Sequence, residues 1–560
     1  MAKLLKVNGR WEWQGTFEER LVAKNAGFHW ESLNKVWYTY DDSTAYKLKE
    51  YIVEEMSIDT QTLSEDAKPS YAVETEFMPP APEGLSYRPY QRAGIEYMYK
   101  RPATLLADPP GTGKTIQVSG LLNTMYNNKE LKGKRVLIVT PASMTLTWER
   151  ELRKWLIWEP TIHTYGASKS KKYSIETFKP EVSIFSYERL SSTYKDYYII
   201  EDLDYGRKAI RMHPEIRCSY DVVVLDEAHF CKSEISKRTM VSMAFASAAS
   251  KKVFMTGTPM LNRPIELWSL ISTLDSETWD NRNKFATYFC NRHLEKVYYK
   301  PKDRFTGARK DARSKSVWVE NGAEHIDELN SMLRTTVMIR RDKSQVLSQL
   351  PEKTVQTVEL PVTCREVAEE LDAWRAMCRK YGDEQEALTK LLGGTLGLDI
   401  DTMAKVRQNV ALAKVPYVAE FVSNYIEQGE KVIVMAHHKA VVDALMEAFS
   451  DFNPVKVVGG MSAEDKQKSV DAFQKDIDTK VFVGNIRAAG VGLTLTASSI
   501  VVFAELDFTP GVMEQCEDRA HRIGQKHSVN VFRLVLKDSL DSYLLEMLKA
   551  KSDISEELLR

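Results

Sequence analysis

ATLLADPPGTGKT, Ala103–Thr115, is the stretch that decides the fold. A short apolar strand pattern runs into a loop with glycines at positions 111 and 113, and an apolar helical pattern follows. The glycines let backbone N–H groups turn inward as a nest for an anion, and the start of a helix adds the positive end of its dipole. The spacing predicts a phosphate-binding loop in which Lys114 reaches the β- and γ-phosphates of ATP and the Thr115 hydroxyl binds Mg²⁺.

Asp108 makes this loop a variant, because a strict phosphate-binding loop has glycine at that position. A glycine turn that only joins a strand to a helix is the plain alternative, and the Gly-Lys-Thr sequence disfavours it. The candidate ATP-binding residues of the loop are therefore Asp108, Gly111, Thr112, Gly113, Lys114 and Thr115.

Two carboxylates follow a second apolar strand pattern in VVVLDEAH, Val222–His229. The four apolar residues place Asp226 at the carboxyl end of a buried strand, where ligands bind in open α/β sheets. We expect Asp226 to hold Mg²⁺ and Glu227 to position and deprotonate the attacking water. His229 has two interpretations: it couples two lobes, or it makes a local hydrogen bond. Together with the loop, this motif predicts nucleotide hydrolysis.

An arginine pair stands near the C-terminus in QCEDRAHRIGQ, Gln515–Gln525. Arg519 and Arg522 are three residues apart, so both side chains can point the same way from one helical turn. Guanidinium groups match the spreading charge of a γ-phosphate transition state. A surface helix held by ion pairs is the alternative, since acidic residues are adjacent. The other two motifs favour the catalytic interpretation, with ATP bound between two lobes that close.

Short Val/Ile/Leu-rich runs recur in two series along the chain, separated by a longer, charged and mostly helical pattern. Such runs indicate strands buried on both faces, as in a parallel sheet flanked by helices. The sequence thus predicts an α/β fold with two parallel-sheet lobes, a helical insertion and a small N-terminal module. The expected strands are Ala103–Leu106, Val136–Val139, Val182–Phe185, Val222–Leu225 and Val253–Met255, then Val432–Met435, Val455–Val458, Val481–Val483, Ile500–Phe503 and Val531–Leu534. The expected domains are the N-terminal module 1–55, a linker 56–84, lobe one 85–275, insertions and connector 276–405, and lobe two 406–560.

Composition predicts a soluble intracellular protein of several domains. The 560 residues exceed what one core supports. Lys and Arg total 77 against 78 Asp and Glu, so any nucleic-acid surface has to be a local basic patch. The six cysteines contain no C-x-x-C pair, which disfavours a disulfide framework and a zinc cluster. No apolar run reaches the roughly 18 residues of a membrane span, so we expect no membrane partner.

Aromatic residues crowd the first fifty-odd positions, where a helix-like stretch over 16–25 ends near Gly27 and a strand pattern covers Val36–Tyr40. At this density they most often form the core of a small domain. Binding of forked or single-stranded DNA is the competing interpretation, because several lysines give the module a mildly basic face.

A basic stretch with interleaved aromatics lies in the insertion, between residues 292 and 315. Solvated charge is the usual explanation of such a run. The aromatics and Gly307 instead favour a mobile loop on nucleic acid. The candidate contacts are Lys300, Lys302, Arg304, Arg309 and Lys310.

These motifs resemble those of superfamily-two helicases of the Snf type, over residues 85–548. The resemblance implies that the two predicted parallel-sheet lobes are RecA-like. RPYQ (Arg88–Gln91) resembles the family's adenine-reading motif, and the likeness extends to LIVTPASMTLTWERE (137–151), SYERL (186–190), MTGTP (255–259), NIRAAGVGLTLTAS (485–498) and HRIGQ (521–525). The resemblance implies ATP contacts from Arg88, Gln91, Gly492 and Gln515. It also implies DNA contacts from Thr140, Pro141, Arg189, Thr258, His437 and Thr494.

Within that branch the chain most resembles the HARP-type annealing helicases, through MIRRDKSQVLSQLPEK (338–353), AHHKAVVDAL (436–445) and residues 501–525. Pro109 and Pro110 depart from the branch, which has an acidic residue and methionine there. The N-terminal module resembles a HARP domain in size, position and aromatic content.

The resemblance implies an ATP-dependent double-stranded DNA translocase that anneals or remodels forked or branched DNA in replication or repair. A Snf-type motor that displaces or slides proteins on DNA is one alternative, and a DNA-binding scaffold with a vestigial ATPase is another. The expected cofactors are ATP and Mg²⁺. The expected partners are double-stranded or forked DNA, with single-stranded DNA or a single-strand-binding protein as further candidates. We expect a monomer in a bacterial, archaeal or viral setting, in the cytoplasm rather than a nucleus.

Overall fold

The computed structural model describes most of the chain, and we consider only those residues. They are 67–165, 179–202, 208–260, 263–299, 313–347, 349–360, 365–381, 398–490, 492–536 and most of 539–549, with 3–7, 10–14, 23–24, 26–31, 36–39 and 44 near the N-terminus. The chain divides into two compact units: Met1–Lys68 with Asn281–Thr335, and Pro69–Asp280 with Thr336–Arg560.

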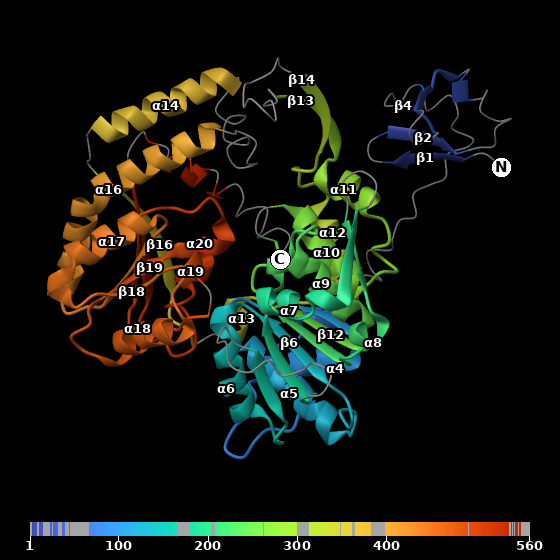
Figure 1. The fold of residues 1–560 in the computed structure, drawn as a ribbon, viewed down its shortest axis with the longest axis horizontal. Coiled ribbons are helices and arrows are strands. Elements are labelled where there is room, and N and C mark those ends of the chain that lie inside the picture. Colours follow the sequence, from blue (N-terminus) through green and yellow to red (C-terminus); the bar gives the residue numbers. More distant parts are fainter. Residues whose placement is uncertain are drawn as a thin grey trace. The chain divides into compact units, whose positions relative to one another are not determined.

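Lobe one of the second unit is built on a seven-stranded sheet whose described neighbours all pair in parallel (Figure 1). The strand order is β15-β5-β12-β11-β6-β8-β7. Because the strands are parallel, the carboxyl ends of neighbours meet at one edge, which places the ends of β5, β6 and β11 together. The strands are β5 (Ala103–Leu106), β6 (Val136–Thr140), β7 (Ile162–Tyr165), β8 (Val182–Ser186), β11 (Val222–Asp226), β12 (Lys251–Met255) and β15 (Met338–Ile339).

Helices follow most strands of lobe one, and an antiparallel hairpin of β9 and β10 precedes β11. α5 begins at Lys114 directly after the glycine loop, and α6 begins at Thr145 after the loop that follows β6. The elements are α4 (Pro89–Lys100), α5 (Lys114–Asn127), α6 (Thr145–Trp155), α7 (Tyr187–Thr193), β9 (Tyr198–Asp202), β10 (Lys208–Met212), α8 (Pro214–Arg217), α9 (Lys237–Ala248), α10 (Trp268–Leu274) and α13 (Lys343–Val346).

Lobe two holds a six-stranded parallel sheet with the order β16-β21-β20-β17-β19-β18. Alternate residues of β17 enter different cores: Ile433 packs with α18, α19 and α20, whereas Val434 packs with α16 and α17. The sheet is therefore buried on both faces, which explains its uninterrupted apolar strands. The elements are β16 (Lys353–Leu360), α14 (Arg365–Tyr381), α16 (Leu398–Glu427), β17 (Val432–Ala436), α17 (Lys439–Ala448), β18 (Val455–Val457), α18 (Ala463–Lys475), β19 (Val481–Asn485), α19 (Ile486–Ala489), β20 (Ile500–Phe503), α20 (Pro510–Glu517) and β21 (Val529–Leu536).

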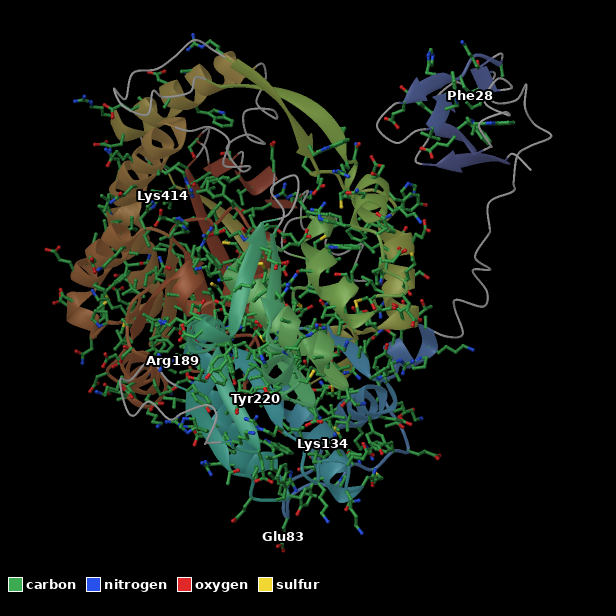
Figure 2. The ribbon with its side chains drawn as sticks, turned by 45° about the vertical axis from the view of Figure 1, so that its right-hand side comes forward. Phe28, Glu83, Lys134, Arg189, Tyr220 and Lys414 are labelled. Atoms are coloured by element: carbon green, nitrogen blue, oxygen red, sulfur yellow. The ribbon has the colours of Figure 1, made fainter. Side chains whose placement is uncertain are left out.

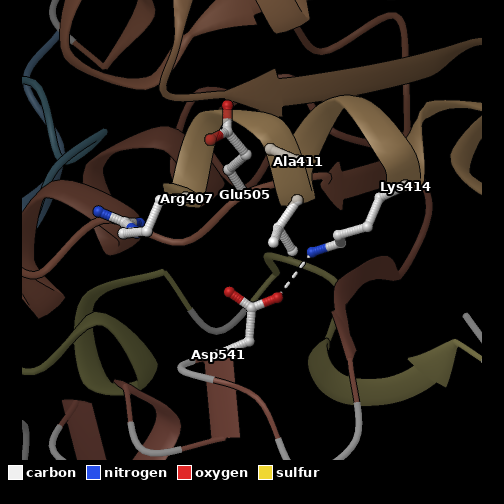
Figure 3. Close-up of a pocket in the computed structure, with 6 residues that line it drawn as sticks. Arg407, Ala411, Lys414, Glu505 and Asp541 are labelled. Atoms are coloured by element: carbon white, nitrogen blue, oxygen red, sulfur yellow. Dashed lines mark hydrogen bonds and ion pairs between the residues drawn. The ribbon is translucent and has the colours of Figure 1, made fainter. Parts of the chain in front are cut away.

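A buried lysine fastens α16 to the end of lobe two (Figure 3). The Lys414 side chain is 2% exposed, and its Nζ donates to the Leu534 carbonyl at 2.7 Å and to Asp541 Oδ2 at 2.8 Å. On the same helix, Arg407 donates to the Leu506 carbonyl after β20. These bonds hold a long helix, with Pro416 inside it, against the sheet.

All ten predicted strands are present, within two residues at each end. Helices cover more of the described residues of 276–405 than strands do, but the prediction of a mostly helical insertion did not foresee strands in three places. β15 belongs to the sheet of lobe one and β16 to that of lobe two, although both lie inside 276–405. Between α11 (Arg282–Cys290) and α12 (Ile326–Thr336), β13 (His293–Tyr299) and β14 (Arg313–Val319) form an antiparallel hairpin. Its strands occupy part of the stretch that we expected to be a loop.

The N-terminal module contains a four-stranded sheet in the order β1-β2-β4-β3. Gly27 has the positive φ expected at a helix end (+104°), and β4 confirms the predicted strand. Trp13 and Phe28 are buried, as expected of aromatics that form a small core. The strands are β1 (Lys3–Val7), β2 (Arg10–Gln14), β3 (His29–Glu31) and β4 (Val36–Thr39).

Residues 69–84 were predicted as linker, yet they pack along lobe one. Thr75 donates a hydrogen bond to Glu96 on α4, and the Phe77 ring stacks on Tyr99 with centroids 6.1 Å apart. The carbonyl of Pro80 accepts from the Tyr87 hydroxyl at 3.1 Å. The polar and proline-rich segment 69–84 is therefore an ordered part of the surface of lobe one. Residues 56–66 of the predicted linker lie outside the described residues.

Candidate ATP site and nucleic-acid interface

The loop between β5 and α5 has the backbone of an anion nest. Gly111 and Gly113 have positive φ values of +83° and +77°, which cost an L side chain strain. A side chain at position 113 would also meet the Gln91 amide 2.6 Å from its Cβ. The Tyr90 hydroxyl (2.8 Å) and Gln91 Nε2 (3.2 Å) donate to the Thr112 carbonyl, so α4 holds the loop from outside.

Lys114 and Thr115 are the first two residues of α5. Lys114 Nζ donates to the carbonyls of Asp108 (2.8 Å) and Pro109 (3.2 Å), so the ammonium already lies within the loop. Burial lowers the pKa of Lys114, and the nearby carboxylates of Glu227, Asp108 and Asp226 oppose that shift.

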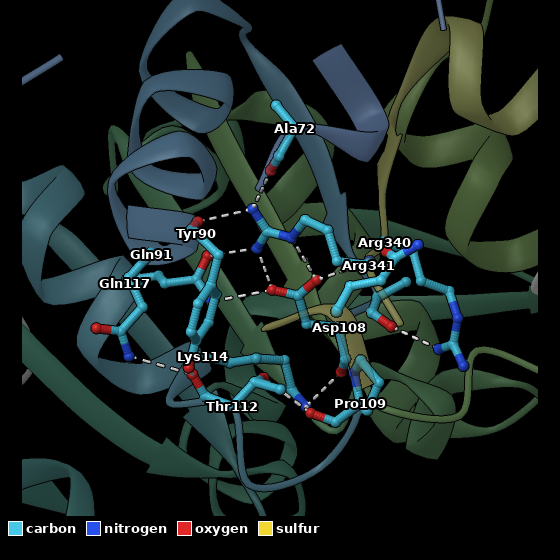
Figure 4. Close-up of polar contacts among 12 residues, drawn as sticks. Ala72, Tyr90, Gln91, Asp108, Pro109, Thr112, Lys114, Gln117, Arg340 and Arg341 are labelled. Atoms are coloured by element: carbon cyan, nitrogen blue, oxygen red, sulfur yellow. Dashed lines mark hydrogen bonds and ion pairs between the residues drawn. The ribbon is translucent and has the colours of Figure 1, made fainter. Parts of the chain in front are cut away.

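Asp108 is bound by a buried arginine that sequence reasoning gave no role (Figure 4). The Arg341 side chain is fully buried, and its guanidinium donates to both carboxylate oxygens of Asp108, through Nε at 2.9 Å and through Nη2. The same group donates to Gln117 Oε1 (3.1 Å) and to the Tyr90 carbonyl (2.8 Å). Burial alone would raise the pKa of Asp108, and Arg341 holds it below its usual value. Asp108, which replaces the usual first glycine of a phosphate-binding loop, thus joins the loop to the segment after β15 through an ion pair.

Asp226 lies at the carboxyl end of β11 and is held by two donors on one oxygen. The Trp148 indole N–H (2.7 Å) and the Thr140 hydroxyl (2.9 Å) both donate to Oδ2. Oδ1 accepts from the Glu227 backbone N–H at 3.0 Å. Burial and the neighbouring Glu227 carboxylate raise the pKa of Asp226 to about 6.

Glu227 follows Asp226 directly and is paired with His229. Its Oε2 is buried, lies 3.3 Å from His229 Nδ1, and has no hydrogen-bond partner among the described residues. Burial raises the pKa of Glu227, but His229, Lys114 and Arg519 outweigh it and hold that pKa at about 2. His229 Nδ1 lies 3.0 Å from Thr256 Oγ1 within lobe one, which corresponds to the local-hydrogen-bond interpretation.

Arg519 and Arg522 lie in the turn that follows α20, and we call residues 518–522 the arginine turn. The sequence had predicted both arginines on a helical turn, but α20 ends before them, at Glu517. The two side chains nevertheless point the same way, since Nη1 of each donates to the Leu493 carbonyl, at 3.4 and 2.9 Å. Burial and the neighbouring Arg519 lower the pKa of Arg522 to about 10. A phosphate beside them would offset that cost.

The structure brings the arginine turn against the glycine loop. A Cβ added to Gly111 would lie 2.8 Å from Arg522 Cβ. Gln515 Nε2 donates to Thr258 Oγ1 at 2.9 Å, again from lobe two to lobe one. A Cβ on Gly492 would meet the Met144 sulfur, so residues 485–498 also touch the loop after β6. The predicted ATP-site residues of both lobes therefore converge.

The predicted DNA contacts fall into four groups. Arg189 and Thr494 are exposed, and Figure 2 shows Arg189 on α7. Pro141 is buried, as are Thr140 and Thr258, whose hydroxyls bond within the protein. His437 is half-buried, and its backbone N–H donates to Glu505. Lys300, Lys302, Arg304, Arg309 and Lys310 lie outside the described residues.

Comparison with known proteins identifies the family. The SNF2-related domain matches residues 90–369, and the helicase conserved C-terminal domain matches residues 413–524. The chain belongs to the SNF2-related helicase family. The two domains are those of a DNA-dependent ATPase. The first match covers lobe one and ends within α14, and the second begins within α16 of lobe two.

Two named relatives are the DNA annealing helicase and endonuclease ZRANB3 of Homo sapiens and the SWI/SNF-related matrix-associated actin-dependent regulator of chromatin subfamily A-like protein 1 of Xenopus tropicalis. The first is 31% identical over 474 residues, which cover 83% of this chain and 40% of the relative. The second is 30% identical over 479 residues, or 84% of this chain and 44% of the relative. The chain thus spans about two fifths of the length of these relatives.

Among solved structures, the Sulfolobus solfataricus SWI2/SNF2 ATPase core in complex with dsDNA matches 86% of this chain and 96% of that chain, with 18% identity and a TM-score of 0.38. Within the described residues, no helix has the length and apolar character that crossing a bilayer demands.

Sequence reasoning missed Arg341, Trp148 and Lys343 as parts of the site. Asp108 carried the one usable signal, because a buried carboxylate at the base of a phosphate loop needs a cation. The partner is 233 positions away in the chain, and no local pattern reveals such a distance.

Proposed function

We propose that the chain is an ATP-dependent translocase on double-stranded DNA that anneals or remodels forked or branched DNA. The observation that carries the motor half is the convergence of Lys114, Asp226 and Glu227 of lobe one with Arg519 and Arg522 of lobe two. A motor of this kind turns lobe closure on ATP into a step along DNA, so its site has to be split between lobes.

Mg²⁺ fits the residues present. Thr115 stands on the first turn of α5, and Asp226 supplies a buried carboxylate whose raised pKa a divalent cation would oppose. Oxygen ligands from one or two side chains, completed by phosphates and waters, are what Mg²⁺ takes in such sites. Bound there, it would neutralise charge on the β- and γ-phosphates.

The chain's own groups supply the rest of the chemistry. Lys114 binds the β- and γ-phosphate oxygens from the loop. Glu227, ionised beside His229, holds the attacking water and accepts its proton. Arg519 and Arg522 stabilise charge on the transferring phosphoryl group, so hydrolysis depends on the contact of the arginine turn with the loop. A vestigial ATPase is disfavoured because none of these side chains is missing.

Two further parts of the proposal, action on duplex DNA and action on forks, rest on the relatives and on the exposed residues that we expect to contact DNA phosphates. Of the two relatives, one is a DNA annealing helicase and endonuclease and the other is a regulator of chromatin. In this chain, Arg189 and Thr494 are exposed positions from opposite lobes, as backbone contacts without base reading require. The basic insertion and the N-terminal module are the proposed determinants of DNA structure.

Fork remodelling tests the proposal. Purified protein, ATP and Mg²⁺ should regress a synthetic replication fork, with Lys114→Ala as the inactive control. Deleting residues 1–55 should leave the duplex-stimulated ATPase in place and weaken fork binding. Unchanged fork regression by the truncated protein would remove the module from the mechanism, and activity in Lys114→Ala would refute the motor.

A further inference from the structure

The chain passes from lobe one to lobe two through a short cationic segment, Arg340–Lys343. β15 ends at Ile339 as the edge strand of lobe one, and β16 begins at Lys353 in the sheet of lobe two. α13 starts at Lys343, with Asp342 as its N-cap. Three of these four residues are cationic, and each of the three binds a different part of the ATP site.

The two arginines fasten the segment to lobe one. Arg340 Nη1 donates to the carbonyl of Ala107 at 2.7 Å and to that of Gly257 at 3.2 Å. Arg341 binds Asp108 at the base of the glycine loop, as Figure 4 shows. Because these acceptors belong to rigid strand ends and to the loop itself, the position of residue 341 is set by lobe one.

Lys343 reaches into lobe two. Its Nζ donates to Asp518 Oδ1 at 2.9 Å and to the His521 carbonyl at 2.6 Å. The Lys343 and Asp518 side chains are 17% and 9% exposed, so water screens the pair weakly. Burial raises the pKa of Asp518, but Lys343 and Lys353 hold it below its usual value.

Each of the two acceptors of Lys343 is the chain neighbour of one arginine of the arginine turn. Asp518 directly precedes Arg519, and His521 directly precedes Arg522. Because Lys343 binds the arginine turn at two points, it restrains both the position and the orientation of that turn relative to lobe one. From Asp108 to Arg341, and then over two residues to Lys343, the loop and the arginine turn are joined by side-chain bonds.

We propose that Lys343 is a positioning residue for ATP hydrolysis, which holds the arginine turn at the correct distance from the glycine loop when the lobes meet. Lys343 touches no reacting atom in this account, and acts through Arg519 and Arg522. The inference rests on the proposed role of those arginines. It predicts a loss of transition-state stabilisation without a loss of ATP binding.

Lys353 provides a matched control. Its Nζ binds Glu517 Oε2 at 2.7 Å and lies 4.0 Å from Asp518 Oδ1, so it supports the same turn. Lys353 belongs to β16 of lobe two, and its ion-pair partners among the described residues, Glu517 and Asp518, lie in lobe two as well. Glu517 keeps a second partner in Arg533, at 3.0 Å, when Lys353 is changed. Substituting Lys353 therefore tests support of the arginine turn within lobe two, whereas substituting Lys343 also tests its placement against the glycine loop of lobe one.

The experiment measures DNA-stimulated ATP turnover in Lys343→Met, Lys343→Arg, Lys353→Met and Arg522→Ala. A displacement of about 1 Å costs on the order of 100-fold in rate. Lys343→Met should therefore lower kcat by about 10- to 100-fold, with KM for ATP within about twofold of the parent. Its affinity for ADP with aluminium fluoride, a transition-state analogue, should fall by the same factor as kcat. Its affinity for a fluorescent ATP analogue should not change.

Lys343→Arg should recover most of the lost kcat, because arginine keeps the charge and the reach. Lys353→Met should melt at a lower temperature and keep kcat within about twofold. An equal loss of kcat in both Lys→Met variants, or an undiminished kcat in Lys343→Met, would overturn the inference. If Lys343→Met does not fold, Lys343→Gln is measured against the same criteria. Full activity in Arg522→Ala would instead refute the proposed arginine role itself.

Discussion

Replacing Trp148 with phenylalanine tests how the magnesium carboxylate is held. Trp148 lies on α6 with its side chain fully buried, and its indole N–H is one of two side-chain donors to Asp226 Oδ2. The substitution removes that N–H and leaves an aromatic ring in place. A hydrogen bond to a charged group contributes about 1.5–3 kcal/mol, and the lost ring atoms add a cavity cost.

The same bond orients Asp226 for the metal. Groups that hold a metal ligand from behind typically change metal affinity or activity by about 10–100-fold when they are removed. We therefore expect Trp148→Phe to raise the Mg²⁺ concentration for half-maximal ATP turnover by about tenfold or more. The assay is ATP turnover at saturating duplex DNA, titrated with Mg²⁺ at fixed ATP.

Trp155→Phe is the control for lost volume. It lies on the same helix, is 7% exposed, and its indole N–H is buried without a hydrogen-bond partner among the described residues. Its substitution removes the same atoms and no bond to Asp226, so the Mg²⁺ requirement should stay unchanged. Equal Mg²⁺ curves for Trp148→Phe and Trp155→Phe would refute the orienting role.

Two further predictions concern buried charges. Arg341→Met leaves the fully buried Asp108 without its cation and should lower the free energy of unfolding by about 3–5 kcal/mol, measured by urea denaturation. The double variant Asp108→Asn/Arg341→Met should lose less than the two single changes together, and strict additivity would exclude direct coupling. Burial, and then Glu517, raise the pKa of Glu514 to about 7, while Lys353 and Arg340 oppose the shift and Asp518 adds to it. A raised folded-state pKa stabilises the fold below the unfolded value of 4.5, and that stabilisation is lost as pH rises through 7. Glu514→Gln should therefore leave the free energy of unfolding nearly unchanged at pH 4 and raise it by up to about 3 kcal/mol at pH 8. An equal change at both pH values would contradict the account.

The local patterns were sufficient for ten of the thirteen strands of the two sheets, and β7, β15 and β16 were missed. Val222–Leu225 and Val432–Met435 are continuous apolar runs because both faces of each sheet are covered, and a buried strand leaves little choice of residue. The glycine loop and Asp226 followed from the same logic, since each stands where a parallel strand ends.

The remaining features depend on distant pairings. Thr140 was predicted at DNA by resemblance, and in the structure its hydroxyl bonds Asp226 because β6 and β11 are neighbours in the sheet. The β13–β14 hairpin was missed because 13 residues separate its strands and no two-residue turn joins them. Arg341 belongs to the segment 338–353, whose sequence resembles that of the HARP-type annealing helicases. Only the fold shows that its side chain binds Asp108.

ATP turnover measured in parallel with duplex, forked and single-stranded DNA and with RNA tests the central claim most directly. The account predicts strong stimulation by duplex DNA, the highest turnover with forks, and loss of turnover in both Lys114→Ala and Arg522→Ala, one from each lobe. Stimulation by RNA or single-stranded DNA above duplex, or full turnover in either variant, would contradict it.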